Sequence, residues 1–215
     1  MNDLEENYRQ TINSWNEVAV VYQEKFMDLN LYDDTYDTFC KLITKSDARI
    51  LEIGCGPGNI SKYIMSVRKD FNLTGTDVSQ NMINLAQQNN PYGKFVVMDC
   101  RNIRLLDDRF DGIICGFVMP YLVKEDCVNL IKDISALINS GGIVYLSIIE
   151  GEYQNSRKMV SSDGLYTMFI FLYNLEFIKN QLLSYGFEFI NHYRKEYQLN
   201  TGLTEIHLIV MARKL

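Results

Sequence analysis

The sequence lacks an excess of basic residues. Its 21 Lys and Arg residues are outnumbered by 27 Asp and Glu residues, which gives a formal net charge of −6 and a pI of about 5.0. Phosphate backbones and anionic lipid surfaces attract basic proteins. The charge balance therefore argues against nucleic acid as a substrate and against a membrane as a partner, although a local basic patch is compatible with it.

Paired cysteines are also lacking. The five cysteines are scattered along the chain and form no Cys-x-x-Cys pair: Cys40, Cys55, Cys100, Cys115 and Cys127. Neither the usual zinc spacings nor a disulfide framework fits such a set. We therefore expect free thiols in a reducing cytoplasm and no metal site.

Long apolar runs, repeats and Pro/Ser-rich linkers are absent as well. No stretch approaches the ~20 apolar residues that span a bilayer. The N-terminal segment Met-Asn-Asp-Leu-Glu-Glu is acidic, whereas a secretion signal begins with basic residues. With 47% hydrophobic residues, the chain of 215 residues has enough apolar side chains for a core. These features predict a soluble cytoplasmic protein with one domain.

From residue 48 onward, short apolar runs alternate with amphipathic stretches. The expected strands are 48–53, 72–76, 94–98, 110–115 and 143–149, and the expected helices include 59–69 and 80–89. A further helix, which should end at Gly141-Gly142, presents one apolar face made of Cys127, Leu130, Ile131, Ile134, Leu137 and Ile138. The alternation predicts a parallel sheet covered by helices on both faces.

The two ends of the chain follow other patterns. Near the N-terminus, apolar residues at steps of three and four form one helical stripe, made of Trp15, Val18, Ala19, Tyr22, Phe26 and Leu29. A second helix is expected over 33–45. After a loop-rich stretch at 150–170 and a helix at 174–185, two long strands over 187–198 and 203–213 are joined by a short turn, which predicts an antiparallel hairpin.

Together these patterns predict an α/β fold with a doubly wound, mostly parallel seven-stranded sheet and a C-terminal antiparallel hairpin. The single domain over 1–215 divides into N-terminal helices at 1–46, a ligand-binding core at 47–149, an insertion at 150–173, and a helix with the terminal hairpin at 174–215.

The stretch ILEIGCGPGN, at residues 50–59, places three glycines directly after the first expected strand. Glycines allow a sharp turn and a close approach of a ligand, and the following helix directs free N–H groups toward it. Asp77 ends the second strand, 23 positions after Gly54. This is near the spacing of a carboxylate that accepts hydrogen bonds from ribose hydroxyls. The ligand is therefore expected to contain a ribose.

Two other nucleotide sites fit less well. The dinucleotide fingerprint requires a third glycine where Asn59 stands, and Pro57 stiffens the loop. A P-loop is excluded because no Gly-Lys-Ser/Thr follows. An NAD-type oxidoreductase stays open as an alternative.

Several stretches in order resemble the class I S-adenosylmethionine-dependent methyltransferases, of the small-molecule type. These stretches are LEIGCGPGN, GTDVSQNMINLAQ, VVMDCRNI, FDGIICGFVMPYL and LINSGGIVYLS, and the terminal hairpin is similar to the last strands of that family. The resemblance covers roughly 45–149 and implies S-adenosylmethionine as cofactor, S-adenosylhomocysteine as product and an in-line methyl transfer. It also implies that the N-terminal helices form an N-terminal helical lid over the cofactor and that the insertion at 150–173 lies on the substrate side.

The resemblance also implies roles for individual residues. The methionyl part would be surrounded by Glu52 and by the loop of Gly54, Cys55, Gly56, Pro57 and Gly58. Asp77 would hold the ribose, and Val78 and Met82 would flank the adenine ring. The adenine edge would bond to Asp99 and to the N–H of Cys100, and the site would also be lined by Cys115, Gly116 and Phe117. Simpler readings stay open for some of them. Asp77 and Asp99 also suit a cap or a surface loop, and Met82, Cys55 and Cys100 also suit core packing.

The sequence offers no convincing catalytic base. His192 and His207 lie in the last two expected strands and are expected to be structural. Tyr121 and Tyr22 are weak candidates for facing the methyl group, with packing as the alternative for each. An acceptor that is already nucleophilic needs no base, because alignment supplies most of the catalysis.

The acceptor is expected to be a small molecule, with Tyr153 and Arg157 of the insertion as candidate contacts. The Asn/Asp-Pro-Pro-Tyr/Phe motif of many base-directed methyltransferases is missing after the fourth strand. A cofactor-binding protein without activity and an RNA or protein methyltransferase remain alternatives. The acceptor's identity and the oligomeric state are left open.

Overall fold

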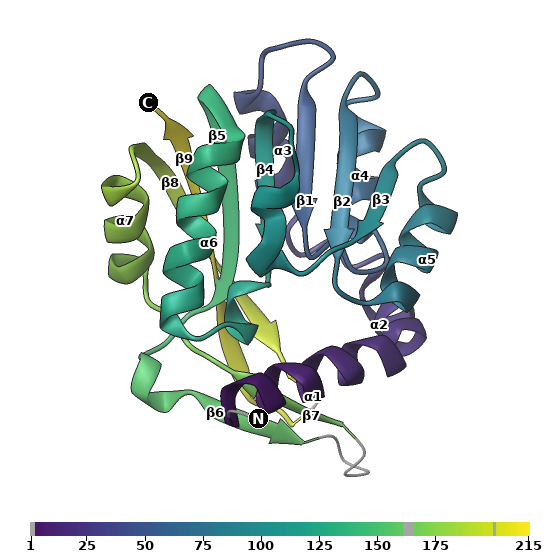
Figure 1. Cartoon of the computed structure of the whole chain (residues 1–215), viewed down its shortest axis with the longest axis vertical. Coiled ribbons are helices and arrows are strands. Elements are labelled where there is room, and N and C mark those ends of the chain that lie inside the picture. Colours follow the sequence, from purple (N-terminus) through teal and green to yellow (C-terminus); the bar gives the residue numbers. More distant parts are fainter. Residues whose placement is uncertain (1–2, 161–165, 200) are drawn as a thin grey trace.

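The computed structural model describes residues 3–160, 166–199 and 201–215, and its centre is one seven-stranded sheet (Figure 1). In spatial order the strands are β3 (Lys94–Val97), β2 (Asn72–Asp77), β1 (Arg49–Ile53), β4 (Phe110–Gly116), β5 (Ile138–Ile149), β9 (Thr204–Lys214) and β8 (Phe187–Gln198). The first five are parallel, whereas β9 is antiparallel to both β5 and β8. The predicted sheet and its terminal hairpin are confirmed.

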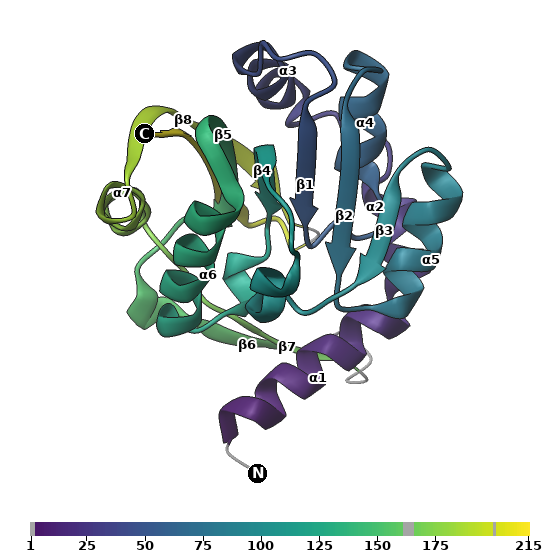
Figure 2. The same ribbon diagram turned by 45° about the horizontal axis from the view of Figure 1, so that its top comes forward.

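Helices cover both faces of this sheet, as Figures 1 and 2 show from two directions. The α-helices are α1 (Asp3–Glu17), α2 (Ala19–Phe26), α3 (Asp33–Leu42), α4 (Asn59–Val67), α5 (Gln80–Asn89), α6 (Lys124–Leu137) and α7 (Leu175–Ser184). Short 3-10 helices are η1 (Cys100–Leu105), η2 (Met119–Tyr121) and η3 (Tyr153–Asn155). The core therefore consists of two apolar layers, one on each side of the sheet.

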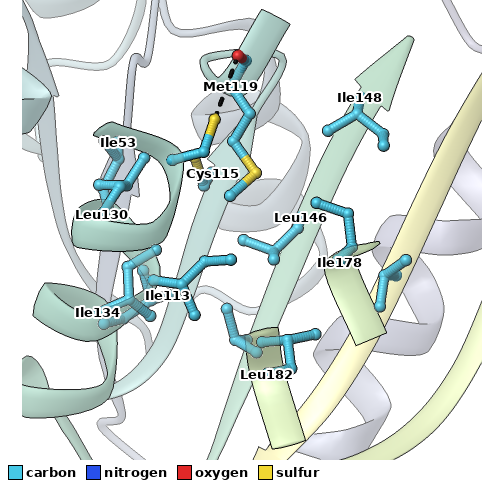
Figure 3. Packing of buried hydrophobic residues seen from close by; sticks show 14 of the residues in the cluster. Ile53, Ile113, Cys115, Met119, Leu130, Ile134, Leu146, Ile148, Ile178 and Leu182 are labelled. Atoms are coloured by element: carbon cyan, nitrogen blue, oxygen red, sulfur yellow. Dashed lines mark hydrogen bonds between the residues drawn. The ribbon is translucent and has the colours of Figure 1, made fainter. Parts of the chain in front are cut away.

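Side chains alternate between these layers along a single strand, as β geometry requires. In β4, Ile113 packs in the layer with α6 and α7, whereas Ile114 packs in the layer with α3 and α4. Figure 3 shows the first layer, where Ile113 and Leu146 of the sheet lie against Ile134 of α6 and Leu182 of α7. Strands that are buried on both faces explain why their sequences are apolar throughout.

The single N-terminal helix that the apolar stripe predicted is interrupted at Val18. This residue has ψ 7°, outside the helical range, so that the chain forms α1 and then the short α2. A β-branched residue has restricted rotamers in a helix and tolerates such a break. Leu29, the last member of the predicted stripe, lies beyond the end of α2.

Two other boundaries differ from the prediction. α6 ends at Leu137, and Ile138 already belongs to β5, where it pairs with Phe110 across a register shift. Tertiary pairing with β4 therefore ends the helix before the two glycines. The stretch 150–170 is not only loop, because β6 (Arg157–Val160) and β7 (Thr167–Ile170) form a separate antiparallel pair; residues 161–165 lie outside the described residues.

Candidate active site

A cavity lies at the carboxyl ends of the parallel strands. α1 runs past these strand ends, as Figure 1 shows. The cavity encloses about 880 Å³ of empty space, including the open solvent at its mouth. Of the sequence-predicted site residues, those that line it are Gly54, Gly56, Asp77, Val78, Met82, Asp99, Cys100, Gly116, Phe117, Tyr22 and Tyr121. The structure thus brings residues from four strand ends and the N-terminal helices to one place.

The glycine loop between β1 and α4 needs glycine for two separate reasons. Gly54 has φ +68°, and a Cβ there would lie 2.2 Å from Cγ2 of Val118. Gly56 has φ +53°, but a Cβ there would make only an ordinary contact, 3.6 Å from the ring of Tyr22. Left-handed backbone disfavours any side chain at either position. Only at Gly54 does packing against the β4 exit add a steric conflict.

Asp77 lies at the end of β2 and holds the glycine loop. Its Oδ2 accepts the N–H of Gly56 at 2.9 Å, and its Oδ1 accepts the N–H of Ser79 at 2.9 Å. Burial raises the pKa of this carboxyl, and the hydrogen bonds to the backbone act in the opposite direction. A carboxylate has about four acceptor positions, so two of them remain for hydroxyl groups in the cavity.

Glu52 is fully buried in β1 beneath the loop and does not line the cavity. Its Oε2 accepts from the hydroxyl of Ser61, whereas Oε1 has no hydrogen-bond partner among the described residues. Burial raises the pKa of Glu52 to about 8, and the charge of Asp77 adds to this effect. An unpaired buried oxygen is costly, and a donor supplied by a ligand near the loop would relieve it.

Asp99 follows β3 and is engaged by Arg101. Its carboxylate accepts the backbone N–H of Arg101 at 2.9 Å and a guanidinium N–H at 2.6 Å. Burial acts to raise the pKa of Asp99, but the bonds from Arg101 outweigh it and lower the pKa. The guanidinium also lies 4.4 Å from the ring centre of Tyr8. Any bond from Asp99 to a ligand would therefore be shared with Arg101.

Aromatic side chains of the N-terminal helices close the cavity from the other side. Trp15 makes edge contacts with both Tyr22 and Tyr121, each with ring centres 5.3 Å apart. Burial raises the pKa of Tyr22 and of Tyr121, which keeps both phenols protonated. Neither is therefore suited to act as a base. Both are placed to exclude water from the cavity.

α1 is fixed over the cavity by hydrogen bonds at several points. Asn16 Oδ1 accepts from the hydroxyl of Ser79 at 2.9 Å and from the N–H of Asn81 at 3.1 Å. Near its other end, the hydroxyl of Tyr8 donates to Asp126 at 2.6 Å. Ser14 bonds the backbone of Thr167 in β7. α1 is thus hydrogen-bonded to both α5 and β7, and its role as a lid stays a prediction.

The remaining predicted site residues do not line the cavity: Glu52, Cys55, Pro57, Gly58, Cys115, Tyr153 and Arg157. Cys55 packs with Ile83 and Ala86, and Cys115 lies in the core (Figure 3). Tyr153 stacks on Phe171 with ring centres 5.8 Å apart, and its expected contact with an acceptor stays a prediction. Arg157 pairs with Glu205 instead of facing the cavity.

Sequence reasoning began the apolar stripe at Trp15 and missed Tyr8, Thr11 and Ile12, which cover the cavity from the same helix. Their spacing of three and four residues continues the apolar stripe toward the N-terminus and could have revealed them. Met98, Arg101, Val118 and Leu122 also line the cavity and had not been singled out.

Over the described ranges of the chain, no helix is long and apolar enough to cross a membrane. Nor do those ranges contain a group of three or more metal-ligating side chains.

Known proteins share both the sequence and the fold of this site. Residues 50–142, which include the glycine loop and Asp77, match a family model described as a methyltransferase domain. YqeM of Bacillus subtilis, whose name describes a methyltransferase, is 33% identical over 121 residues, which are 53% of this chain and 48% of that protein. A tRNA N(3)-methylcytidine methyltransferase of Schizosaccharomyces pombe is 23% identical over 170 residues, which are 74% of this chain and 68% of that protein.

The chain spans about half the length of several curated relatives. Among solved structures, magnesium protoporphyrin IX methyltransferase of Synechocystis PCC 6803 with bound S-adenosylhomocysteine has a TM-score of 0.73 and 15% identity, covering 95% of this chain and 97% of that one. At that identity the likeness establishes the fold. Residues 50–142 thus resemble a methyltransferase domain, and the chain has the fold of solved S-adenosylmethionine-dependent methyltransferases.

Proposed function

We propose that this protein binds S-adenosylmethionine and transfers its methyl group to a small-molecule acceptor. The observation that carries the proposal is Asp77, whose carboxylate lines the cavity while holding Gly56 of the glycine loop at 2.9 Å. A ribose needs such an acceptor beside a loop that a nucleoside can approach closely. The unpaired oxygen of Glu52 beneath that loop is consistent with a ligand that brings a further donor.

The remaining cavity residues suit the other parts of the cofactor. Val78 and Met82 supply apolar surface beside Asp77, as an adenine ring requires. The N–H of Cys100 and the carboxylate of Asp99 lie at the end of β3, where the adenine edge would be read. The N-terminus of α4 and the loop backbone favour the carboxylate of the methionyl part.

S-adenosylmethionine supplies an activated sulfonium methyl group. The chain's own task is then to align the acceptor with that methyl carbon and sulfur, which contributes on the order of 7–11 kcal/mol in favourable reactions. Trp15, Tyr22 and Tyr121 exclude water from the cavity beneath α1. Gly116 and Phe117, at the exit of β4, line the same cavity and are the proposed neighbours of the methyl group.

The position of α1 over the cavity favours a small acceptor. α1 lies across the cavity and is bonded to α5 through Asn16 and to β7 through Ser14. A folded nucleic acid would have to displace this helix, and the net charge of −6 does not attract it. The relative named as a tRNA methyltransferase makes RNA the second candidate.

Ligand-induced shifts of the melting temperature test the cofactor. At 100 times its Kd, a ligand adds about 2.7 kcal/mol to the free energy of unfolding, which corresponds to roughly 5–10 °C for a domain of this size. S-adenosylhomocysteine should produce this shift and NAD should not. A shift with NAD alone would instead support an oxidoreductase.

Asp77→Ala should abolish the shift, and Asp28→Ala is a matched control. The Asp28 side chain is 89% exposed and does not line the cavity. A folded Asp77→Ala variant with undiminished affinity would show that this carboxylate is not part of the site.

A panel of small acceptors and unmodified tRNA, assayed with labelled S-adenosylmethionine, would then distinguish a small-molecule enzyme from an RNA methyltransferase and from a protein that only binds the cofactor.

A further inference from the structure

Arg101 is the one basic side chain among the described residues that line the cavity. It lies in η1, directly after β3, and its side chain is 27% exposed. The rest of the lining is mostly aromatic, aliphatic or glycine, and a charged group in such surroundings is costly unless it is paired. The role of Arg101 therefore depends on its partners.

The guanidinium of Arg101 contacts both carboxylate oxygens of Asp99. Nη2 donates to Oδ2 at 2.6 Å, and Nε lies 3.0 Å from Oδ2 and 3.1 Å from Oδ1. The backbone N–H of Arg101 donates to Oδ1 at 2.9 Å as well. Three N–H groups of one residue thus fill most of the about four acceptor positions of this carboxylate. A ligand can therefore donate to Asp99 only from a narrow range of directions.

α1 contacts the same guanidinium. Its Cζ lies 4.4 Å from the ring centre of Tyr8, and Nη1 lies 3.6 Å from Oε1 of Glu5. A cation at this distance from an aromatic ring is attracted to it. Tyr8 is fixed in turn at its hydroxyl, which donates to Asp126 at 2.6 Å. Arg101 therefore connects Asp99, at the end of β3, to the helix that covers the cavity.

These contacts argue against another use of Arg101, which is the binding of an anionic acceptor. The positive charge is already hydrogen-bonded to the carboxylate of Asp99, and the carboxylate of Glu5 lies nearby. A further carboxylate beside these two would be repelled by both of them. The surroundings suit a guanidinium that orients Asp99.

We propose that Arg101 is a positioning residue that holds the Asp99 carboxylate toward the amino group of the adenine and connects it to α1. This inference rests on the proposed function, because it concerns the adenine end of the same cofactor site. Asp99 and Arg101 both line the cavity beside Cys100, where the adenine edge would lie. An ionised carboxylate only accepts hydrogen bonds, so it matches an amino group and repels a carbonyl oxygen. Arg101 thereby contributes to the choice of adenine over a base with a 6-oxo group.

Loss of the guanidinium should change the protonation of Asp99 as well as its position. Burial raises the pKa of this carboxyl, whereas the hydrogen bonds and the charge of Arg101 lower it. Without Arg101 the neutral acid becomes more favourable. A protonated carboxyl group has one O–H donor besides its acceptors, so it can bond either an amino group or a carbonyl oxygen. The preference for adenine should then weaken.

The ratio of two dissociation constants tests this role. Calorimetric titration would compare S-adenosylhomocysteine with S-inosylhomocysteine, in which an oxygen replaces the adenine amino group. We expect the wild-type protein to prefer S-adenosylhomocysteine by about tenfold or more, and Arg101→Gln to reduce this preference by about fivefold or more. Arg104→Gln is the matched control, because Arg104 lies in the same 3-10 helix, has a side chain that is 51% exposed and does not line the cavity. A general loss of stability would weaken both ligands alike and leave the ratio unchanged.

Hydrogen exchange tests the connection to α1. Saturating S-adenosylhomocysteine should slow the exchange of α1 amides in the wild-type protein and in Arg104→Gln. The slowing should be smaller in Arg101→Gln, because the ring of Tyr8 loses its contact with the guanidinium. Equal slowing in the two variants overturns the connection to α1.

The outcomes separate this inference from the proposed function. If the wild-type protein binds neither ligand, the proposed function fails. If it binds both ligands equally, or if Arg101→Gln and Arg104→Gln show the same ratio, the role of Arg101 is overturned and the proposed function stands. Should Arg101→Gln fail to fold, Arg101→Lys keeps the charge but loses the two-pronged geometry, and an unchanged ratio in that variant overturns the inference as well.

Discussion

Asp77 accepts the N–H of Gly56 at 2.9 Å, so the carboxylate that lines the cavity is hydrogen-bonded to the glycine loop that also lines it. The two halves of the proposed nucleoside site are therefore joined by a hydrogen bond within the chain itself. A site whose parts are already positioned loses less conformational entropy on binding. The connection also means that substitutions at either residue affect both loop order and ligand affinity.

Gly54→Ala should destabilise the fold more than Gly56→Ala. Both changes place a side chain on left-handed backbone, at a cost of roughly 1–2 kcal/mol. Only at Gly54 does the new Cβ also meet Val118, at 2.2 Å from Cγ2. Urea unfolding should show favourable coupling between Gly54→Ala and Val118→Ala in a double-mutant cycle. Additive effects of the two changes would contradict the steric explanation.

Glu52→Gln should flatten the pH dependence of stability between about pH 4.5 and 8. Burial raises the pKa of Glu52 from 4.5 to about 8 in the folded state, so the folded protein binds a proton that the unfolded chain releases. The contribution of this proton to the free energy of unfolding is complete below pH 4.5 and is lost as the pH rises through 8. The free energy of unfolding then changes by at most about 1.4 kcal/mol per pH unit. Urea unfolding of both proteins at pH 5, 6.5 and 8 measures it. Parallel pH profiles would show that Glu52 is not the group responsible.

Tyr8→Phe should loosen the N-terminal end of the lid. The Tyr8 hydroxyl donates to Asp126 at 2.6 Å and accepts the N–H of Val123 at 3.0 Å, so its removal leaves polar groups without partners. We expect a loss of about 1–3 kcal/mol in stability and faster hydrogen exchange in α1. Tyr92→Phe is the matched control, because Tyr92 is 92% exposed. Equal effects of the two variants would argue against this contact.

Asn16→Ala should speed the release of S-adenosylhomocysteine. Asn16 joins α1 to the start of α5 by accepting from Ser79 and Asn81 and by its own carbonyl, which accepts from the Asn81 side chain at 2.9 Å. The side-chain bonds are lost in the variant, so the lid should open more often. Stopped-flow displacement measures the dissociation rate, and Asn13→Ala on the exposed face of the same helix is the control. Unchanged dissociation would indicate that α1 is not the barrier to release.

The sheet and the meeting of the glycine loop with Asp77 at one cavity were predictable because both depend on local patterns. Apolar strands, a glycine loop and Asp77 at a strand end each follow from a few adjacent residues. Tertiary contacts determine what was missed. Ile138 left its predicted helix because it pairs with Phe110, and the β6–β7 pair lies against α1 through Thr167 and Ser14.

The cover of the cavity joins α1 to much later parts of the chain. Ser14 is bonded to Thr167, which lies 153 positions further along, and Tyr8 is bonded to Asp126, 118 positions further along. During synthesis α1 therefore emerges well before either of these partners. The apolar face of α1 that is finally buried against the cavity therefore stays exposed, or is bound by a chaperone, until these partners have been synthesised. The cavity becomes closed to water only near the end of folding.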